Sequence, residues 1–281
     1  MVTVRLISGL GNQMFQYAVG RAISLRRGAS LALDVSAFPD RANRQYSLGV
    51  FKIIENVTLG GPMRSRLLRG LCRRVRLPGL PHVVHENGHA FDPSVLEAPD
   101  EAYLIGYWQS EKYFKDVEGV IRREFSFKIE PDPQNVEMAG RIKGLNAVAV
   151  HVRRGDYVSD PVDNRTMGTC PREYYREAVQ WVASRVSNPH FFVFSDEPDW
   201  ARANLKLEGP ATFVSNNTLA NGYEDLRLMS FCRHHIIANS TFSWWAAWLS
   251  NSDGITVAPK IWFRSGKLDT RDVVPERWVR L

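Results

Sequence analysis

The sequence predicts an α/β protein built on parallel β-sheets. Short apolar segments typical of buried strands alternate with segments whose apolar residues recur at helical spacing. Because strand–helix–strand units form parallel sheets with right-handed crossovers, this alternation favours parallel pairing. The chain has 281 residues, of which 44% are hydrophobic and 23% charged, which suits one large globular domain or two small ones.

The first half of the chain contains three predicted strands and two predicted helices around a long stretch without pattern. Apolar residues recur on one face of the first helix between Phe15 and Leu25. Between residues 39 and 100, scattered prolines and glycines favour loops and short helices. The strands are expected at 2–7, 31–33 and 101–107, and the second helix at 110–123.

The second half is patterned almost throughout. Residues 146–152 form a continuous apolar run, as expected for a central strand that is buried on both faces. Pro171 is suited to the start of the helix that follows it. The stretch 124–145, which contains prolines and glycines, is the expected boundary between two α/β units. Further strands are predicted at 190–194, 234–238 and 255–258, and further helices at 223–233 and 241–249.

Polar segments follow four of the predicted strands directly. Ligands of open parallel sheets bind beyond the carboxyl ends of the strands, so these segments predict binding sites. They are residues 9–13, 153–157, 195–197 and 239–243.

Two adjacent arginines, Arg153 and Arg154, follow the strand predicted at 146–152. Guanidinium groups at such a position need an anionic partner, and a phosphate accepts paired hydrogen bonds from each of them. A diphosphate ligand would meet this need, and so would salt bridges to Asp156 or Asp196. The sequence alone leaves both alternatives open.

Residues 239–243 form a strand-to-helix junction with hydroxyl groups at Ser240, Thr241 and Ser243. Such a junction either caps the helix in the ordinary way or binds phosphate through its free N–H groups and the helix dipole. The loop with Gly9 and Gly11 follows the same logic but lacks the third glycine of a dinucleotide-binding motif.

Several motifs that bind metals or nucleotides are missing from the sequence. There is no GxxxxGK[ST] loop and no Asp-x-Asp triplet, so a P-loop and a metal–diphosphate clamp are not expected. His234 and His235 are adjacent in a predicted strand and would point to opposite faces, so they cannot share a metal. Three widely spaced cysteines predict reduced thiols and no zinc site. We therefore expect no metal cofactor.

Five segments, in order along the chain, together resemble the α-1,2-fucosyltransferases. They are GLGNQMFQYA at 9–18, GYWQSEKYF at 106–114, HVRRGDY at 151–157, FSDE at 194–197 and NSTFSWW at 239–245. The resemblance implies a GT-B fold, in which two Rossmann-like domains with parallel sheets face each other across a cleft. Residues 1–140, completed by the tail 262–281, would form the acceptor-side domain, and 141–261 the donor domain.

The same resemblance implies the reaction. Fucose would pass from GDP-fucose to the 2-hydroxyl of a galactoside, with inversion and without a metal, in the synthesis of bacterial surface glycans such as O-antigen. The acceptor would be a galactose-containing oligosaccharide, which in such synthesis is lipid-linked. Animal members of the family carry a membrane anchor, so this chain resembles the soluble bacterial type.

Individual residues take roles by the same resemblance. Arg153 would hold the β-phosphate, and His151 and Asp225 would contact the nucleoside. Apart from the resemblance, a direct displacement needs a base for the acceptor hydroxyl. Asp156, two residues beyond Arg154, is our candidate, with Glu111 and Glu197 behind it. Arg153 and Asp156 are thus the predicted catalytic residues. The predicted donor-binding residues are Gly11, Asn12, His151, Arg153, Arg154, Ser195, Asp196, Asp225, Asn239, Ser240, Thr241 and Ser243.

The net charge of +6 resides in residues 64–76, which contain six arginines and no acid. Without this segment the chain is neutral, which argues against general nucleic-acid binding. The segment predicts a basic amphipathic helix with an apolar face that includes Leu67 and Leu71. That helix would either rest on the inner face of the plasma membrane or pack against its own domain. No apolar run approaches the ~18 residues of a membrane span, and we expect a cytoplasmic protein.

Two other functions stay open on the sequence alone. One is the transfer of another GDP-linked hexose through the same diphosphate site. The other is a basic module that binds anionic lipid or nucleic acid through residues 64–76. The identity of the acceptor glycan and the oligomeric state cannot be predicted from these patterns.

Overall fold

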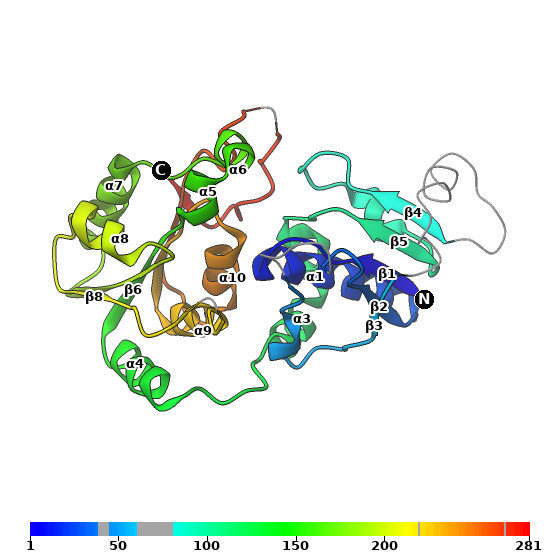
Figure 1. Ribbon diagram of the computed structural model, residues 1–281, viewed down its shortest axis with the longest axis horizontal. Coiled ribbons are helices and arrows are strands. Elements are labelled where there is room, and N and C mark those ends of the chain that lie inside the picture. The colour runs from blue at the N-terminus through cyan, green and yellow to red at the C-terminus, as the bar shows by residue number, and fades with distance from the viewer. Residues whose placement is uncertain (39–44, 61–80, 219, 267) are drawn as a thin grey trace. The chain divides into compact units, whose positions relative to one another are not determined.

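The computed structural model describes residues 1–38, 45–60, 81–218, 220–266 and 268–281 (Figure 1). Its internal contacts divide the chain into two units. The first comprises Met1–Ile129 with Asp269–Val273, and the second comprises Glu130–Leu268 with Val274–Leu281. Each unit contains one sheet in which every recorded strand pair is parallel. The predicted α/β class with parallel sheets is confirmed.

The sheet of the first unit has five strands in the order β3-β2-β1-β5-β4. Helix α1 (Leu10–Arg27) follows the central strand and packs against it. The side chains of Met14, Ala18 and Ala22 are fully buried on its inner face, and this burial stabilises the layer. The strands are Val2–Arg5 (β1), Leu31–Asp34 (β2), Val57–Thr58 (β3), His82–His85 (β4) and Ala102–Ile105 (β5).

The predicted helix at 110–123 is broken in the structure. Two 3₁₀ turns, η3 (Glu111–Tyr113) and η4 (Lys115–Val117), precede α3 (Glu118–Glu124). Phe114 lies between the turns with φ −136°, outside the helical range. Its ring is fully buried at 6.2 Å from the ring of Phe15. Burial of this ring against α1 therefore replaces the regular helix that the pattern predicted.

The sheet of the second unit has six strands in the order β11-β10-β9-β6-β7-β8. Strand β6 is central, and every one of its residues pairs with β7. The strand coincides with the apolar run predicted at 146–152. The strands are Asn146–Val152 (β6), Pro189–Ser195 (β7), Ala211–Phe213 (β8), His234–Ile236 (β9), Thr256–Ala258 (β10) and Val279–Arg280 (β11).

The helices of the second unit bury a core that is rich in aromatic residues. On α10 (Thr241–Leu249), the rings of Trp244, Trp245 and Trp248 are almost completely buried, as predicted. Helix α9 (Tyr223–Phe231) packs against α10. The other helices are Pro133–Lys143 (α4), Gly155–Ser159 (α5), Pro161–Thr166 (α6), Arg172–Ala183 (α7) and Pro198–Asn204 (α8). None of the helices in the described ranges is long and apolar enough to cross a membrane.

The division of the chain differs from the predicted boundary after residue 140. The stretch read as a linker contains α4, which packs on α9 and β6 of the second unit. Its start is encoded locally, since Asp132 accepts from the backbone N–H of Asn135 at 2.9 Å and Pro133 occupies the first turn. The capping residues at the start of α4 were therefore overlooked, because the prolines and glycines around them favoured a boundary between units.

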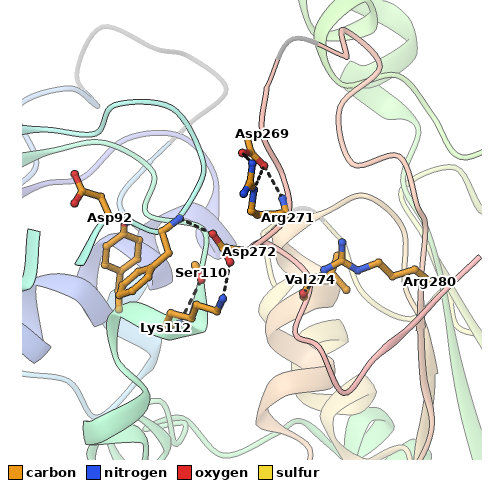
Figure 2. A network of polar contacts seen from close by, with 10 residues as sticks. Asp92, Ser110, Lys112, Asp269, Arg271, Asp272, Val274 and Arg280 are labelled. Carbon is orange, nitrogen blue, oxygen red and sulfur yellow. Dashed lines mark hydrogen bonds and ion pairs between the residues drawn. The ribbon is translucent and has the colours of Figure 1, made fainter. Parts of the chain in front are cut away.

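The C-terminal tail is shared between the units, whereas we expected 262–281 to complete the first. Asp272 accepts from Nζ of Lys112 at 2.6 Å and from the backbone N–H of Phe91 at 2.9 Å, all within the first unit. Farther on, Arg280 donates to the carbonyl of Val274 at 2.7 Å, and β11 pairs with β10 in the second unit. Figure 2 shows Lys112 with Asp272, and Arg280 with Val274. The basic segment 64–76 lies outside the described residues.

Candidate functional site

Arg153 lies at the carboxyl edge of the second sheet, directly after β6. Strands β6 and β7 end side by side because Val152 pairs with Ser195. Arg153 donates from Nη1 to Oδ2 of Asp196 at 3.0 Å, and from Nη2 to Oδ1 of Asp156 at 2.5 Å. Burial opposes its positive charge, but the two carboxylates outweigh burial and raise the pKa of Arg153. The side chain is thus a fixed cation at the edge of the sheet.

Of the two alternatives for this arginine, the structure contains the salt bridges. A guanidinium group has more N–H donors than these two contacts use, so it can also bind a phosphate oxygen. The carboxylates hold the side chain in one place in advance. Such an arrangement is suited to an anion that arrives later, because little side-chain entropy is left to lose.

Asp196 also fixes the turn that carries both arginines. Its Oδ1 accepts from the backbone N–H of Arg154 at 2.9 Å, while its Oδ2 holds Arg153. Burial raises the pKa of Asp196, and the neighbouring Arg153 opposes this shift. A Cβ atom at Gly155 would lie 2.6 Å from Oδ2 of Asp196. The glycine in the segment 151–157 is therefore required by the position of this carboxylate.

Arg154 is held by a second set of contacts. Its Nε donates to Oε2 of Glu197 at 2.9 Å, and its guanidinium carbon lies 3.9 Å from the ring centre of Trp200. The backbone N–H of Glu197 in turn donates to Oγ of Ser195 at 3.0 Å. Sequence reasoning did not identify Trp200, because only the fold brings α8 against the end of β6. The only sequence feature that could have identified Trp200 is the presence of an aromatic residue near a strand end.

His151 is a buried side chain with an unpartnered ring nitrogen. Its exposed fraction is 6%, and Nδ1 has no hydrogen-bond partner among the described residues. Burial, with a smaller contribution from Arg153, lowers the pKa of His151 to about 3, so the ring is neutral near pH 7. Buried polar atoms in proteins are nearly always hydrogen-bonded. The free Nδ1 is therefore a candidate contact for a ligand.

The N-terminus of α10 lies at the same edge, because β9 pairs with β6. Ser240 is the N-cap residue, and its side chain makes no capping hydrogen bond. Its carbonyl accepts from the backbone N–H of Trp244 at 3.0 Å and from Oγ of Ser243 at 3.3 Å. The buried Ser243 hydroxyl thus stabilises the first turn. Thr241 is only partly buried, and the N–H groups of this turn are suited to an anion.

Asn239, which we predicted to bind the donor, is a structural anchor in the protein. Its Nδ2 lies 3.0–3.1 Å from the carbonyl oxygens of Met167, Gly168 and Trp262, and its Oδ1 accepts from Sγ of Cys170 at 3.5 Å. Both ends of the amide are therefore engaged. The side chain joins three segments of the second unit behind the predicted site.

Asp225 lies on α9 in a cluster of asparagines that sequence reasoning missed. Asn217 donates to its Oδ1 at 2.7 Å, and Asn217 also donates to Oδ1 of Asn135 on α4. Burial raises the pKa of Asp225 to about 6, although the hydrogen bond from Asn217 opposes this shift. Two adjacent asparagines, Asn216 and Asn217, follow β8. They are one more polar segment at a strand end, the signal that identified the other four.

The remaining predicted residues, Gly11 and Asn12, belong to the first unit, in the first turn of α1. Asn12 donates to Oγ of Ser8 at 3.0 Å and accepts from Nε2 of Gln109 at 2.9 Å. The neighbouring Gln13 donates to the carbonyls of Ser8 and Gln45, both at 2.9 Å. The amides of the segment 9–18 thus stabilise the loops around β1.

The adjacent histidines have separate partners, as their predicted opposite orientations require. Nδ1 of His234 accepts from the backbone N–H of Ile255 at 2.9 Å. Nε2 of His235 lies 2.9 Å from the carbonyl oxygen of Met229. Within the described ranges, no group of three or more His, Cys, Asp or Glu side chains is arranged to hold a metal ion.

Comparison with known sequences gives a family match. The model of glycosyl transferase family 11 matches residues 84–281. An α-1,2-colitosyltransferase of Escherichia coli is 35% identical over 100% of this chain and 99% of its own length. The O-antigen biosynthesis glycosyltransferase WbnK of Escherichia coli is 28% identical over 98% of this chain and 99% of its own. The bovine galactoside α-(1,2)-fucosyltransferase 2 is 28% identical over 92% of this chain and 71% of its own length.

Solved structures give the fold. The fucosyltransferase NodZ from Bradyrhizobium matches with a TM-score of 0.51 and 14% identity over 87% of this chain and 91% of its own. A mutant FUT1 of Arabidopsis thaliana matches with a TM-score of 0.50 and 13% identity, over 91% of this chain and 69% of its own. With the two parallel sheets, these likenesses confirm the predicted GT-B type of fold.

Proposed function

The chain belongs to glycosyl transferase family 11, and on that premise we propose that it transfers fucose from GDP-fucose to the 2-hydroxyl of a galactoside. The predicted resemblance to α-1,2-fucosyltransferases is confirmed by the family match and by the relatives that carry that name. The observation that carries the proposal of a diphosphate-linked sugar donor is Arg153, held by two carboxylates at the edge of the second sheet. The name of one relative supports a place in O-antigen synthesis.

In the proposed reaction, the acceptor hydroxyl oxygen attacks the anomeric carbon of fucose on the face opposite the diphosphate. The new C–O bond forms as the bond to the phosphate oxygen breaks, and its electron pair leaves with GDP. A base takes the hydroxyl proton. Negative charge grows on the leaving diphosphate, so a fixed guanidinium and helix N–H groups stabilise the transition state more than the ground state. Arg153 and the first turn of α10 supply these groups, and we propose no metal.

The carboxylate of Asp156 stays our candidate for the base. Its Oδ1 accepts from Arg153 at 2.5 Å, so it lies beside the group that we propose to hold the diphosphate. A diphosphate on Arg153 would compete for the guanidinium and weaken that pairing. Glu197, by contrast, is paired with Arg154, and Glu111 is buried.

The direct test is to incubate the protein with GDP-fucose and a panel of β-galactosides and to determine the linkage of the product by NMR. We expect an α-1,2 linkage and GDP release, with undiminished activity in excess EDTA. Absence of transfer to every galactoside, or a different linkage, would contradict the proposed function. Loss of activity in EDTA would contradict the metal-independent mechanism alone.

A second candidate is the transfer of colitose, which lacks the 3-hydroxyl of fucose. It is favoured by the full-length identity of 35% to an α-1,2-colitosyltransferase, against 28% for the bovine fucosyltransferase. GDP-fucose and GDP-colitose, offered at equal concentration with the same acceptor, distinguish the two. A higher kcat/KM for GDP-colitose would replace fucose with colitose in our proposal and leave the site unchanged.

A further inference from the structure

The second unit contains a network of asparagines that the proposed mechanism does not use. It joins the start of α4, the loop after β8 and the start of α9. Asn135 on α4 lies at its centre and is 1% exposed. Buried amides are costly unless their N–H groups and carbonyl oxygens find partners. The contacts within the network therefore define which of its atoms are left for a ligand.

The side chains of Asn135 and Asn217 form a reciprocal pair of amides. Nδ2 of Asn135 donates to Oδ1 of Asn217 at 2.9 Å, and Nδ2 of Asn217 donates to Oδ1 of Asn135 at 3.1 Å. Nδ2 of Asn135 also donates to Oδ2 of Asp132 at 2.9 Å, and its Oδ1 also accepts from Asn216 at 2.9 Å. A reversed Asn135 amide would place its oxygen against the Asp132 carboxylate, so the orientation of the pair is fixed.

Asn217 uses its whole amide group, and one of its contacts holds Asp225. Its second N–H donates to Oδ1 of Asp225 at 2.7 Å, and its oxygen also accepts from Asn221 at 3.0 Å. Because an amide has two N–H donors and two acceptor lone pairs, Asn217 has no hydrogen-bonding capacity left for a ligand. Its place in the network is that of a group which sets the position of the Asp225 carboxylate.

Two acceptor oxygens of the network are left open. Oδ2 of Asp225 accepts no hydrogen bond in the described part of the chain. Oδ1 of Asn216 is buried and likewise has no partner among the described residues. Both oxygens belong to side chains that the pair of Asn135 and Asn217 holds in place. Fixed acceptors without donors suit a ligand that presents N–H groups.

We infer that Asn135 and Asn217 are positioning residues that orient Asp225 toward the nucleobase of the donor. Guanine presents its N1–H and 2-amino groups side by side, and one carboxylate can accept from both, whereas adenine has an acceptor at N1. Asp225, held by Asn217, therefore selects guanine over adenine. The inference rests on the proposed function for the GDP-linked donor and on the predicted contact between Asp225 and its nucleoside.

Protonation of Asp225 gives a second readout of the same contact. Burial raises the pKa of Asp225 to about 6, and the hydrogen bond from Asn217 opposes this shift. Without Asn217 the pKa should rise further, so the carboxylate is lost at a higher pH than in the wild type. The other charged groups beside the network are Asp132 at the start of α4 and, on α9, Glu224, which pairs with Arg227. A substitution of Asn217 leaves them in place.

The test compares GDP with ADP, which carry the same diphosphate on different bases. Calorimetry with both nucleotides is carried out on the wild type, Asn217→Ala and Asn135→Ala, at pH values on either side of the pKa of Asp225. We expect the wild type to prefer GDP, and each variant to bind GDP about tenfold more weakly, or ~1.4 kcal/mol, because the charged contact is no longer oriented. The affinity for ADP should stay within about twofold. Relative to ADP, the loss of GDP affinity on acidification should begin at a higher pH in Asn217→Ala.

Asn251→Ala is the matched control, since Asn251 is an exposed asparagine of the same unit. It should bind both nucleotides as the wild type does. Thermal melting identifies a variant that does not fold, and Asn217→Ala serves alone if the more deeply buried Asn135→Ala does not. The inference is overturned if the wild type has no preference for GDP, or if Asn217→Ala keeps that preference or loses affinity for both nucleotides equally. Failure of the proposed function would appear differently, as absence of fucose transfer by a wild type that binds GDP in preference to ADP.

Discussion

The position of Arg153 depends on a space that only glycine leaves open. Oδ2 of Asp196 approaches within 2.6 Å of the place where a Cβ of residue 155 would stand. Gly155→Ala should therefore displace the carboxylate and, with it, the guanidinium that it holds at 3.0 Å. We expect kcat/KM for GDP-fucose to fall by about tenfold or more.

The matched control for this substitution is Gly140→Ala. Gly140 lies in α4, and a Cβ atom there would meet nothing within 4 Å. This variant should keep full activity and gain about 0.5–1 kcal/mol of stability from the reduced freedom of the unfolded chain. Normal kinetics in Gly155→Ala would show that Arg153 does not depend on Asp196.

A lysine cannot replace Arg153. Its ammonium group carries the charge but cannot donate to Asp156, Asp196 and a phosphate in fixed directions. We expect Arg153→Lys to lower kcat/KM for GDP-fucose by more than about tenfold, or ~1.4 kcal/mol. Arg176→Lys, on the exposed side of α7, is the control. A smaller loss in Arg153→Lys would remove this residue from the phosphate site.

Asp225 should make the stability of the protein dependent on pH. Burial raises the pKa of its carboxyl to about 6, above the value of an unfolded chain. Between about pH 4 and pH 6 the folded state then binds more protons than the unfolded state, so this group lowers the free energy of unfolding as the pH rises. Asp225→Asn should be more stable than the wild type by ~3 kcal/mol well above pH 6, with no gain below pH 4. Urea denaturation at several pH values measures the difference, and equal pH profiles would contradict the assigned shift.

At the scale of elements, Asn239 joins segments that are far apart in the sequence. Its amide donates to the carbonyls of Met167, Gly168 and Trp262. Because buried carbonyls would lose their partner, Asn239→Ala should lower the free energy of unfolding by about 2–3 kcal/mol. Asn251→Ala, at an exposed position after α10, should leave the free energy of unfolding unchanged. Unchanged stability of Asn239→Ala with weaker GDP binding would support the predicted role of this residue in donor binding instead.

Elements with a strong local pattern were predicted well, and elements defined by distant contacts were not. The run at 146–152 and the helix at 241–249 match β6 and α10, because each is buried on both sides and bounded by polar residues. The prediction of one helix at 110–123 was wrong, because Phe114 interrupts it and the burial of this ring depends on contacts with α1. Strand β4 was missed because its mixed sequence, HVVH, forms a strand only beside β5.

The candidate site follows the same rule. Strand ends located Arg153 and Arg154 in the sequence, since polar residues directly after an apolar run need no tertiary information. Trp200 was missed because it lies within a helix, beyond the polar segment that follows the strand. Asn239 was assigned to a ligand, although its contacts are made with three segments that no local pattern connects to it.

At the scale of the whole molecule, the net charge of +6 remains a property of residues 64–76. We propose that this segment attracts the anionic inner face of the plasma membrane, near lipid-linked acceptors. Replacement of Arg69, Arg73 and Arg74 by serine should weaken binding to anionic liposomes by about 3 kcal/mol, on the basis of about 1 kcal/mol per charge. Neutral liposomes are the control. Unchanged binding to anionic liposomes would leave the alternative, in which the leucines pack on the domain.

The shared C-terminal tail determines how the protein can be taken apart. Asp269–Val273 belongs to the first unit, whereas the residues on either side of it belong to the second. A single protease cut near residue 129 would therefore not release either unit, because the chain returns to the first unit and leaves it again. The fragment 1–129 would also lack Asp272, the partner of Lys112 and of the Phe91 N–H group. Neither half of this enzyme is a continuous piece of sequence, so neither can be exchanged with a relative by one crossover in the gene.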